Sequence, residues 1–291
     1  AWMTHGSETQ FTATSVMPDI GNFATLTFFA TMTFAFAGLE LGPAMGGEIK
    51  SPERSLPRAM LISGLIIAVI YIAGTAILLI AVPEGEINVI TGIPQALAAI
   101  GDRVSLPGLA FVGALLVVMS STGGLGAWVS GVARIPYAIG IDRYLPQALG
   151  ATHPTYGTPH VALITQGVIV TVLMLAAVAG ATIEEAYIML LDMTIILYFI
   201  PFLYMFAALP VLRMKAKGRN DGVSLVPFGA VGPWLFGGLG FAATLLSIIL
   251  ALIPAEGTEN PTMFLVKVAG GCLAFIGVGL FFFQKNRARS D

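Results

Sequence analysis

The chain has very few charged residues. Lysine, arginine, aspartate and glutamate make up only 10% of its 291 residues, whereas 56% are hydrophobic and the mean hydropathy is +0.88. A soluble globular domain has about 25% charged residues. This deficit excludes a water-soluble fold. The basic residues are also dispersed among short loops, which argues against a nucleic-acid partner.

Cysteine is nearly absent as well. The single Cys272 excludes a disulfide within the chain, and the histidines do not have the spacing of metal ligands. The sequence also lacks a nucleophile elbow, a P-loop and an HExxH motif. We therefore expect no metal site, no cofactor and no enzymatic activity.

Long apolar runs dominate what is present. Each is long enough to cross a bilayer as a helix, which takes about 20 residues. The runs are continuous rather than alternating, which favours helices over transmembrane strands. We expect an all-α integral membrane protein with seven spans: Ile20–Gly47, Met60–Val82, Pro107–Ile135, Val161–Gly180, Ala186–Leu212, Pro233–Ile253 and Met263–Phe283. The shorter segment Thr91–Ile100 is expected to form a surface or re-entrant helix.

Basic residues set the orientation, since cytoplasmic loops are enriched in lysine and arginine. With seven alternating spans, every lysine and arginine except Arg103 and Lys267 falls on one side. The first span is therefore expected to enter from outside, and the C-terminus to be cytoplasmic. Ala1 would then lie outside with no signal-peptide pattern before it, so we expect the natural chain to begin further upstream.

The first span carries an acid and several helix breakers. Glu40 lies among Gly38, Gly42 and Pro43, and two further glycines follow at Gly46 and Gly47. A carboxylate at membrane depth costs about 2.5–3.5 kcal/mol on insertion scales. A broken helix with an acid is typical of substrate sites in carriers. Glu40 is either a packing residue or, as we favour, a proton-coupling or gating group.

Phe34, Ala35, Phe36, Ala37 and Gly38 flank the expected break. They are either ordinary lipid-facing residues or a binding segment. In a binding segment, exposed carbonyls would accept an ammonium group and the aromatic rings would cover it. We favour the binding segment.

The third and fifth spans hold two further candidates. Trp128 stands in GGLGAWVSG, where the glycines permit close helix packing, and it either packs there or forms the floor or gate of a cavity. The hydroxyls of Ser120, Ser121, Thr122 and Ser130 either line an ion or substrate path or, as we favour for any single one, bond back to their own helix. Asp192 is a second acid within a span, and it either reaches water at the outer interface or acts inside the membrane.

Two sequence blocks resemble the amino acid–polyamine–organocation transporter superfamily. FAFAGLE with GEIKSPERSLPRA looks like the sixth helix of that family and the loop after it. GGLGAWVSGVARIPYAIGIDRYLPQAL with HPTYGTPH looks like the eighth helix and the loop into the ninth. The resemblance covers residues 20–283.

The resemblance implies a permease that carries amino acids or related amines across the cell (inner) membrane by alternating access. The seven spans would be helices six to twelve of an inverted-repeat, five-plus-five fold, so the chain would be the C-terminal part of a carrier. The implied regions are an outer loop at 1–19, the second repeat at 20–212, a cytoplasmic loop at 213–230, and two helices with a cytoplasmic tail at 231–291.

By position, Phe34 would be an outer aromatic gate, Ala35 to Gly38 the amine-binding backbone, and Glu40 the buried acid after it. Trp128 would lie below the substrate. The expected partners are an amino acid or amine, protons or sodium, and membrane lipid. Two alternatives stay open from the residues alone: an accessory membrane subunit that does not transport, and a membrane-embedded enzyme that uses Glu40 or Asp192 as a base.

Overall fold

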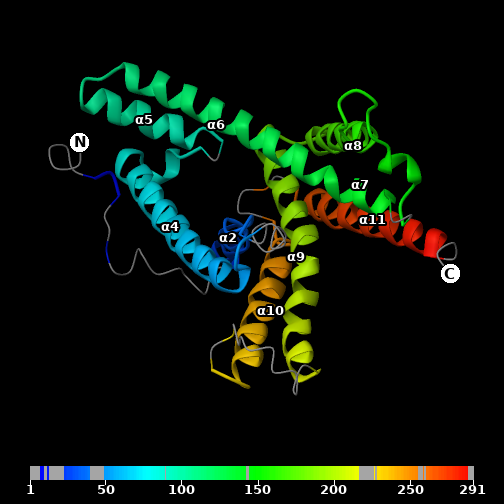
Figure 1. The fold of residues 1–291 in the computed structure, drawn as a ribbon. Helices are drawn as coiled ribbons and strands as arrows, with labels where there is room; N and C mark the ends of the chain where they lie inside the picture. The colour runs from blue at the N-terminus through cyan, green and yellow to red at the C-terminus, as the bar shows by residue number, and fades with distance from the viewer. Residues whose placement is uncertain are drawn as a thin grey trace. The chain divides into compact units, whose positions relative to one another are not determined.

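A computed structural model describes residues 7–9, 12, 23–39, 49–88, 90–141, 144–215, 226, 228–254, 258 and 260–287. Within these residues the chain is helical, without strands (Figure 1). The helices are α2 (Phe23–Phe34), α4 (Pro52–Ala81), α5 (Gly92–Arg103), α6 (Gly108–Val132), α7 (Arg134–Ile141), α8 (His160–Val178), α9 (Ile183–Lys215), α10 (Gly232–Leu250) and α11 (Pro261–Arg287), with short 3-10 turns η2 (Glu84–Glu86) and η3 (Gln147–Gly150).

Six stretches of helix are long and apolar enough to cross a membrane. They lie at Arg54–Ala81, Gly108–Ile141, His160–Val178, Ile183–Lys215, Gly232–Leu250 and Pro261–Asn286. They confirm the last six of the seven predicted spans and the all-α membrane fold. The short helix expected at Thr91–Ile100 is α5, and its place at the surface or as a re-entrant segment stays a prediction. In the predicted first span, the described residues form the 12-residue helix α2, and Glu40 lies outside the described residues.

Local sequence explains the bounds of the longest helix. At the start of α9, the Glu185 N–H donates to Thr182 Oγ1 at 3.1 Å, and the Thr182 N–H donates to Glu185 Oε2 at 3.1 Å. This reciprocal capping box satisfies two N–H groups that have no helical partner. Arg213 and Lys215 lie in the last turn, where positive charge complements the helix dipole. The helix continues through Pro201 and Pro210.

The chain forms two compact units, and helices α4, α9 and α11 each contribute to both. The first unit contains residues 1–10, 77–190 and 270–291, and the second contains residues 11–76 and 191–269. These units are assembled from separate stretches of sequence. The repeat and loop boundaries expected from the sequence stay a prediction.

In the first unit, α5 and α6 pack as a helical hairpin, which Figure 1 shows in teal and green. Gly113 on α6 lies directly against the Leu97 side chain, so a larger residue there would collide with it. Ala81, Val82 and Ala96 form a small buried cluster at the junction of α4 and α5. Gly140 on α7 packs against the backbone of Leu149 and Gly150.

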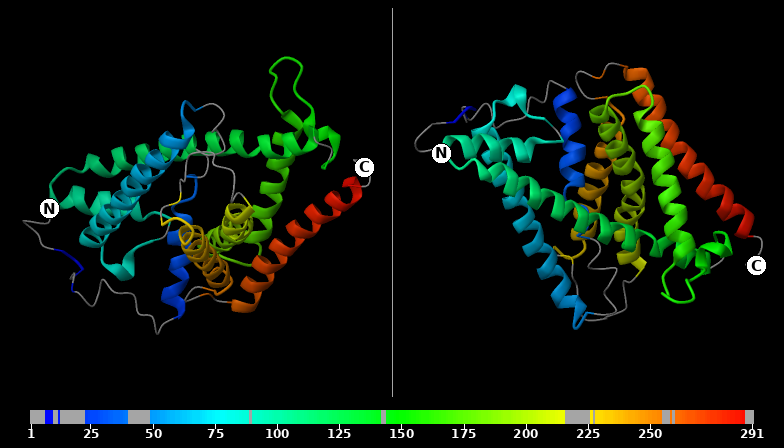
Figure 2. Two further views of the ribbon diagram at one scale, coloured as in Figure 1. Left: turned by 60° about the horizontal axis from the view of Figure 1, so that its bottom comes forward. Right: turned by 90° about the horizontal axis from the view of Figure 1, so that it is seen from above.

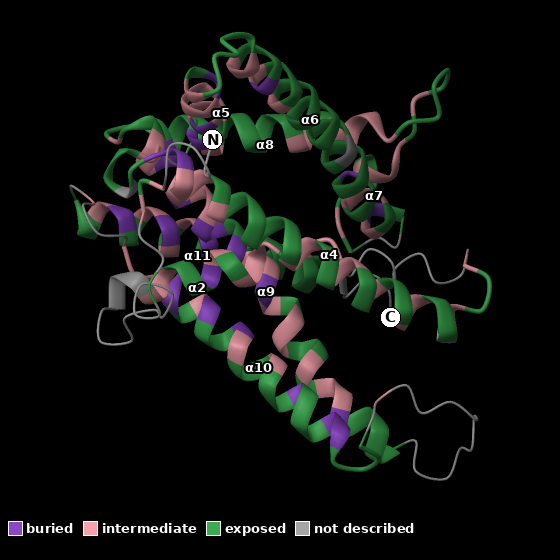
Figure 3. Ribbon diagram, turned by 90° about the vertical axis from the view of Figure 1, so that its left-hand side faces the viewer, coloured by how far each residue is buried: buried purple, intermediate pink, exposed green. Residues whose placement is uncertain are grey.

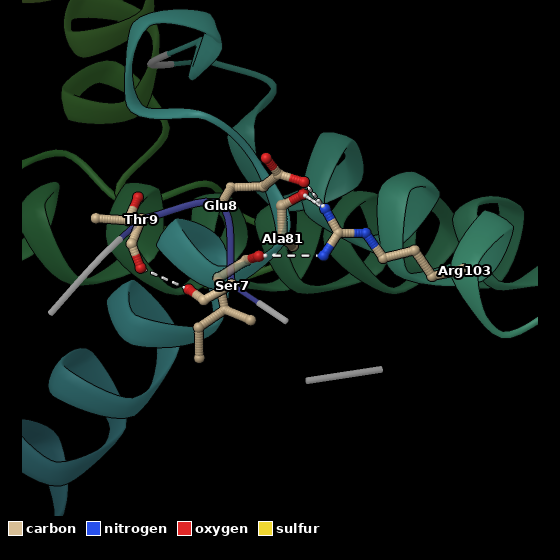
Figure 4. A network of polar contacts seen from close by, with 6 residues as sticks. Ser7, Glu8, Thr9, Ala81 and Arg103 are labelled. Atoms are coloured by element: carbon tan, nitrogen blue, oxygen red, sulfur yellow. Dashed lines mark hydrogen bonds and ion pairs between the residues drawn. The ribbon is translucent and has the colours of Figure 1, made fainter. Parts of the chain in front are cut away.

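Arg103 ties the end of α5 to the end of α4 (Figure 4). Its guanidinium donates to the carbonyl oxygens of Ile80 at 3.3 Å and Ala81 at 3.2 Å, and it forms an ion pair with Glu8. The Glu8 N–H also donates to the Ile80 carbonyl at 3.3 Å. The last carbonyls of a helix have no partner within it, so these bonds satisfy two groups that would otherwise remain open.

The second unit is built around α2, α9 and α10. Helix α10 packs against α2, and the three helices lie together in both views of Figure 2. Glycines allow α10 to approach α9 closely: a Cβ at Gly237 would lie 2.9 Å from the Phe206 carbonyl oxygen, and a Cβ at Gly240 would collide with the Phe206 ring. Ala30 on α2 is fully buried.

The helices differ in how much of their surface is covered (Figure 3). In the most apolar part of α10, 28% of the residues are buried, against 6% for α4 and 6% for the α6–α7 stretch. The side chains left exposed on α4 include Leu61, Leu65 and Ile72. Apolar surface of this extent suits contact with lipid acyl chains or with other membrane helices.

Candidate functional site

Helix α2 ends at Phe34, where the sequence predicts the break. Residues 35–39 continue as turns, and Gly38 has a φ of +105°, a backbone conformation that favours glycine. The Ala35 N–H still donates to the Thr31 carbonyl at 2.9 Å, but the Ala37 N–H donates to the Phe34 carbonyl at 2.8 Å. The backbone hydrogen bonds thus change from joining residues four positions apart to joining residues three positions apart, which marks a tightened last turn of the helix.

In this turn, several backbone acceptors have no donor among the residues that the structure describes. Within the described part of the chain, no group donates a hydrogen bond to the carbonyl oxygens of Ala35, Phe36 or Ala37. Open backbone carbonyls at membrane depth are costly unless they line a cavity or bind a ligand. A ligand with several N–H donors, such as an ammonium group, has the chemistry to satisfy them.

The ring of Phe34 packs against two aromatic residues of α9, Tyr198 and Phe199, which we call the aromatic seat. The ring meets Tyr198 edge-on, with centroids 5.4 Å apart and planes at 90°, and it meets Phe199 with centroids 6.2 Å apart and planes at 73°. Edge-to-face pairs at such distances are favourable because the positive ring edge faces the negative ring face. Phe36, in contrast, is 39% exposed.

Further aromatic contacts follow along α9. Tyr198 and Phe199 both contact Phe202, with centroid distances of 5.3 Å and 6.0 Å, and Phe202 contacts Phe206 at 6.3 Å. Tyr198, Phe202 and Phe206 recur every four residues, which places them on one face of the helix. This aromatic face was not predicted from the sequence. The four-residue spacing of the three rings indicates that they share a face, but Phe34, which packs beside them, lies far away in the sequence.

Trp128 does not belong to the unit that holds Phe34. It lies on α6 in the first unit and is 49% exposed. Its expected role below the substrate stays a prediction. On the same helix, Thr122 Oγ1 donates to the Val118 carbonyl at 2.7 Å and Ser130 Oγ donates to the Gly126 carbonyl at 2.8 Å. Both bonds confirm that these hydroxyls bond back to their own helix.

Asp192 on α9 is a buried acid, with 9% of its surface exposed. It shares one side of the helix with the buried residues Met189, Ile196 and Phe199, which precede or follow it by three, four and seven positions. Asp192 therefore lies on the same side of α9 as Phe199, one of the two residues that the Phe34 ring contacts. Among the described residues, no group of three His, Cys, Asp or Glu side chains is arranged to hold a metal ion.

Comparisons with known proteins identify the family. The model of the amino acid permease family matches residues 1–280. An uncharacterized transporter of Legionella pneumophila is 28% identical over 94% of this chain and 59% of its own length. The serine/threonine exchanger of Bacillus subtilis is 32% identical over 77% of this chain and 49% of its own length.

A glutamate/γ-aminobutyrate antiporter of Lactococcus lactis is 24% identical over 84% of this chain and 49% of its own length. The chain thus spans about half to three fifths of these relatives. No solved structure matches it. The family match confirms the resemblance seen in the two sequence blocks, and the apolar helices make this a multi-pass membrane protein. The chain belongs to the amino acid permease family, within the amino acid–polyamine–organocation superfamily.

Proposed function

We propose that the protein is a secondary active transporter that carries amino acids or related amines across the cell membrane by alternating access, and is not an enzyme. The observation that carries this proposal is the end of α2. There, no group among the described residues donates a hydrogen bond to the carbonyls of Ala35, Phe36 and Ala37, and the preceding Phe34 ring packs against α9. Two of the relatives are named as an exchanger of serine and threonine and an antiporter of glutamate and γ-aminobutyrate, and all four of these compounds bear an amino group.

The open carbonyls and Phe34 have distinct roles in this proposal. The carbonyls of Ala35, Phe36 and Ala37, with the turn at Gly38, accept hydrogen bonds from the substrate ammonium. These acceptors cannot rearrange as water does, so they select an ammonium over an uncharged group. Phe34 covers the site, and its contacts with Tyr198 and Phe199 hold the cover in place.

Two residues complete the proposed site on sequence grounds. Glu40 follows the open turn in the sequence and is proposed as the proton-coupling or gating group. Trp128 is proposed to lie below the substrate. The coupling ion in this proposal is a proton rather than sodium, because an acid at membrane depth gains and loses a proton readily when its surroundings change.

The charge pattern supports an orientation for the described helices. Glu184 and Glu185 begin α9, whereas Arg213 and Lys215 end it. Since positive residues favour the cytoplasmic side, α9 is proposed to enter from outside. Helix α2 enters from outside as well, and residues 20–212 form the second repeat of the inverted-repeat fold.

The experiment is exchange in proteoliposomes. The full-length natural protein is reconstituted, and uptake of labelled serine, threonine, glutamate and γ-aminobutyrate is followed with and without the same compound inside the vesicles. The proposal expects uptake of at least one probe that internal substrate accelerates. Uptake no faster than in protein-free vesicles, across a panel of all common amino acids and their amines, would contradict it and favour a non-transporting membrane subunit.

A further inference from the structure

Asp192 is a buried acid with no assigned task. It is the only charged residue between Glu185 and Arg213, a stretch that is otherwise apolar or uncharged. Only 9% of its surface is exposed, while Met189, Ile196 and Phe199 on the same side of α9 are buried too. An ionised carboxylate in such surroundings is unfavourable unless a cation or a hydrogen-bond donor accompanies it.

The described residues supply no such companion. No side chain in that part of the protein donates a hydrogen bond or an ion pair to the Asp192 carboxylate. The other buried polar side chains of this unit behave differently. Ser247, for example, is fully buried and donates its hydroxyl to the Ala243 carbonyl at 2.9 Å. Asp192 is therefore a buried carboxyl group whose hydrogen-bonding capacity the described side chains leave unused.

Asp192 lies two helical turns along α9 from Phe199, a residue that contacts Phe34. Asp192 precedes Phe199 by seven residues on one side of the helix, which corresponds to two turns and about 10 Å. Phe199 contacts the ring of Phe34. With α9 entering from outside, a solute on its way in passes Asp192 about two turns before it reaches Phe34.

We propose that Asp192 forms an outer cation site that receives the ammonium group of the substrate before the substrate passes Phe34. This inference rests on the proposed function, since it assumes that the cargo bears an ammonium group. The carboxylate attracts that group and pairs with it through charge-assisted hydrogen bonds. The open carbonyls beyond Phe34 then take over the same group, which moves inward without losing all its partners at once.

The burial of Asp192 agrees with a transport cycle of alternating access. With 9% exposure, the carboxylate accepts a solute only after the surrounding helices separate, as alternating access requires. An ion pair formed there is poorly screened by salt, unlike one at the surface. The site thus favours solutes that carry a positively charged amino group and disfavours carboxylic acids that lack one.

The first test compares charge-matched variants of the full-length carrier. Asp192→Asn removes the charge and keeps the shape, and Glu184→Gln removes one charge at the start of the same helix. For an amino acid that the wild type carries, Asp192→Asn is expected to raise KM by about 10- to 100-fold, the usual effect of losing a hydrogen bond to a charged group, while the maximal rate stays near wild type. Glu184→Gln is expected to leave KM within twofold.

Two results overturn the inference. The first is a wild-type KM in Asp192→Asn; if the pH dependence of uptake is lost as well, Asp192 is the proton-coupling group instead. The second is an equal rise of KM in Glu184→Gln. If the wild-type carrier moves none of the amine probes, the proposed function fails instead.

A second measurement uses the wild-type protein, so it does not depend on how well a variant folds. Dicyclohexylcarbodiimide modifies carboxyl groups in apolar surroundings, and mass spectrometry gives the fraction of Asp192 that is modified. Serine, threonine, glutamate and γ-aminobutyrate are each compared with the corresponding 2-hydroxy or 4-hydroxy acid. Protection by at least one amine and not by its hydroxy analogue supports the site. Equal modification in all cases contradicts it, whether or not the protein transports.

Discussion

Replacing Phe34 by alanine tests whether this ring closes the site. The ring makes two aromatic contacts, with centroids 5.4 Å from Tyr198 and 6.2 Å from Phe199. An aromatic pair contributes about 0.5–1.5 kcal/mol beyond its buried area. Losing both pairs therefore lowers the stability of the closed conformation, in which Phe34 covers the site, by about 1–3 kcal/mol. Since 1.4 kcal/mol corresponds to a factor of ten, the closed-to-open ratio should fall by about 5- to 140-fold.

The assay is substrate affinity in the purified full-length protein. If the closed state retains the substrate, Phe34→Ala raises the dissociation constant by the same 5- to 140-fold. Phe34→Leu, which keeps apolar bulk without an aromatic face, should fall between the wild type and the alanine variant. Phe28→Ala is the control, because Phe28 lies on the same helix but is 63% exposed.

A double-mutant cycle separates the ring contact from general damage. Tyr198→Ala should weaken binding less in the Phe34→Ala background than in the wild type, because the pair interaction is already lost. The reasoning is refuted if Phe34→Ala binds substrate within twofold of wild type. An effect of the same size in Phe28→Ala would refute it as well, since Phe28 is largely exposed and, among the described residues, makes no ring contact with Tyr198 or Phe199.

Three further changes test the turn, the acid and the packing. Gly38→Leu should abolish substrate binding, whereas Gly38→Ala, which shares the strain at φ +105° but adds little bulk, should keep part of it in a titration. Glu40→Gln should weaken the pH dependence of uptake at normal expression, and an unchanged pH profile would remove Glu40 from coupling. Gly237→Ala should destabilise the protein by about 1–3 kcal/mol in thermal unfolding, because its Cβ would lie 2.9 Å from a backbone oxygen. Gly238→Ala, whose Cβ meets nothing within 4 Å, should not.

Sequence alone predicted the features that depend on local pattern. Apolar runs located the six spans, and Gly38 with its neighbours located the end of α2. Prediction of the third span was less complete. It was expected as one helix to Ile135, whereas α6 ends at Val132 and α7 starts at Arg134. Pro136 lies in the first turn of α7, where a missing N–H costs no helical bond.

Features that depend on distant contacts were not predicted. The ion pair of Glu8 with Arg103 joins residues 95 positions apart, and the ring contact of Phe34 joins α2 to α9. No local pattern specifies such partners, because the residues around Glu8 or Phe34 carry no information on which distant residue folds against them. The four-residue spacing of Tyr198, Phe202 and Phe206 predicts a shared helix face but not what covers it.

The central claim is that the backbone after Phe34 binds the substrate's ammonium group. An experimental structure of the full-length protein with a transported amino acid tests it most directly. The account predicts the amino nitrogen within about 2.7–3.2 Å of at least two carbonyl oxygens among Ala35, Phe36 and Ala37. A continuous helix through these residues, or an ammonium group bound elsewhere in the closed state, would contradict it.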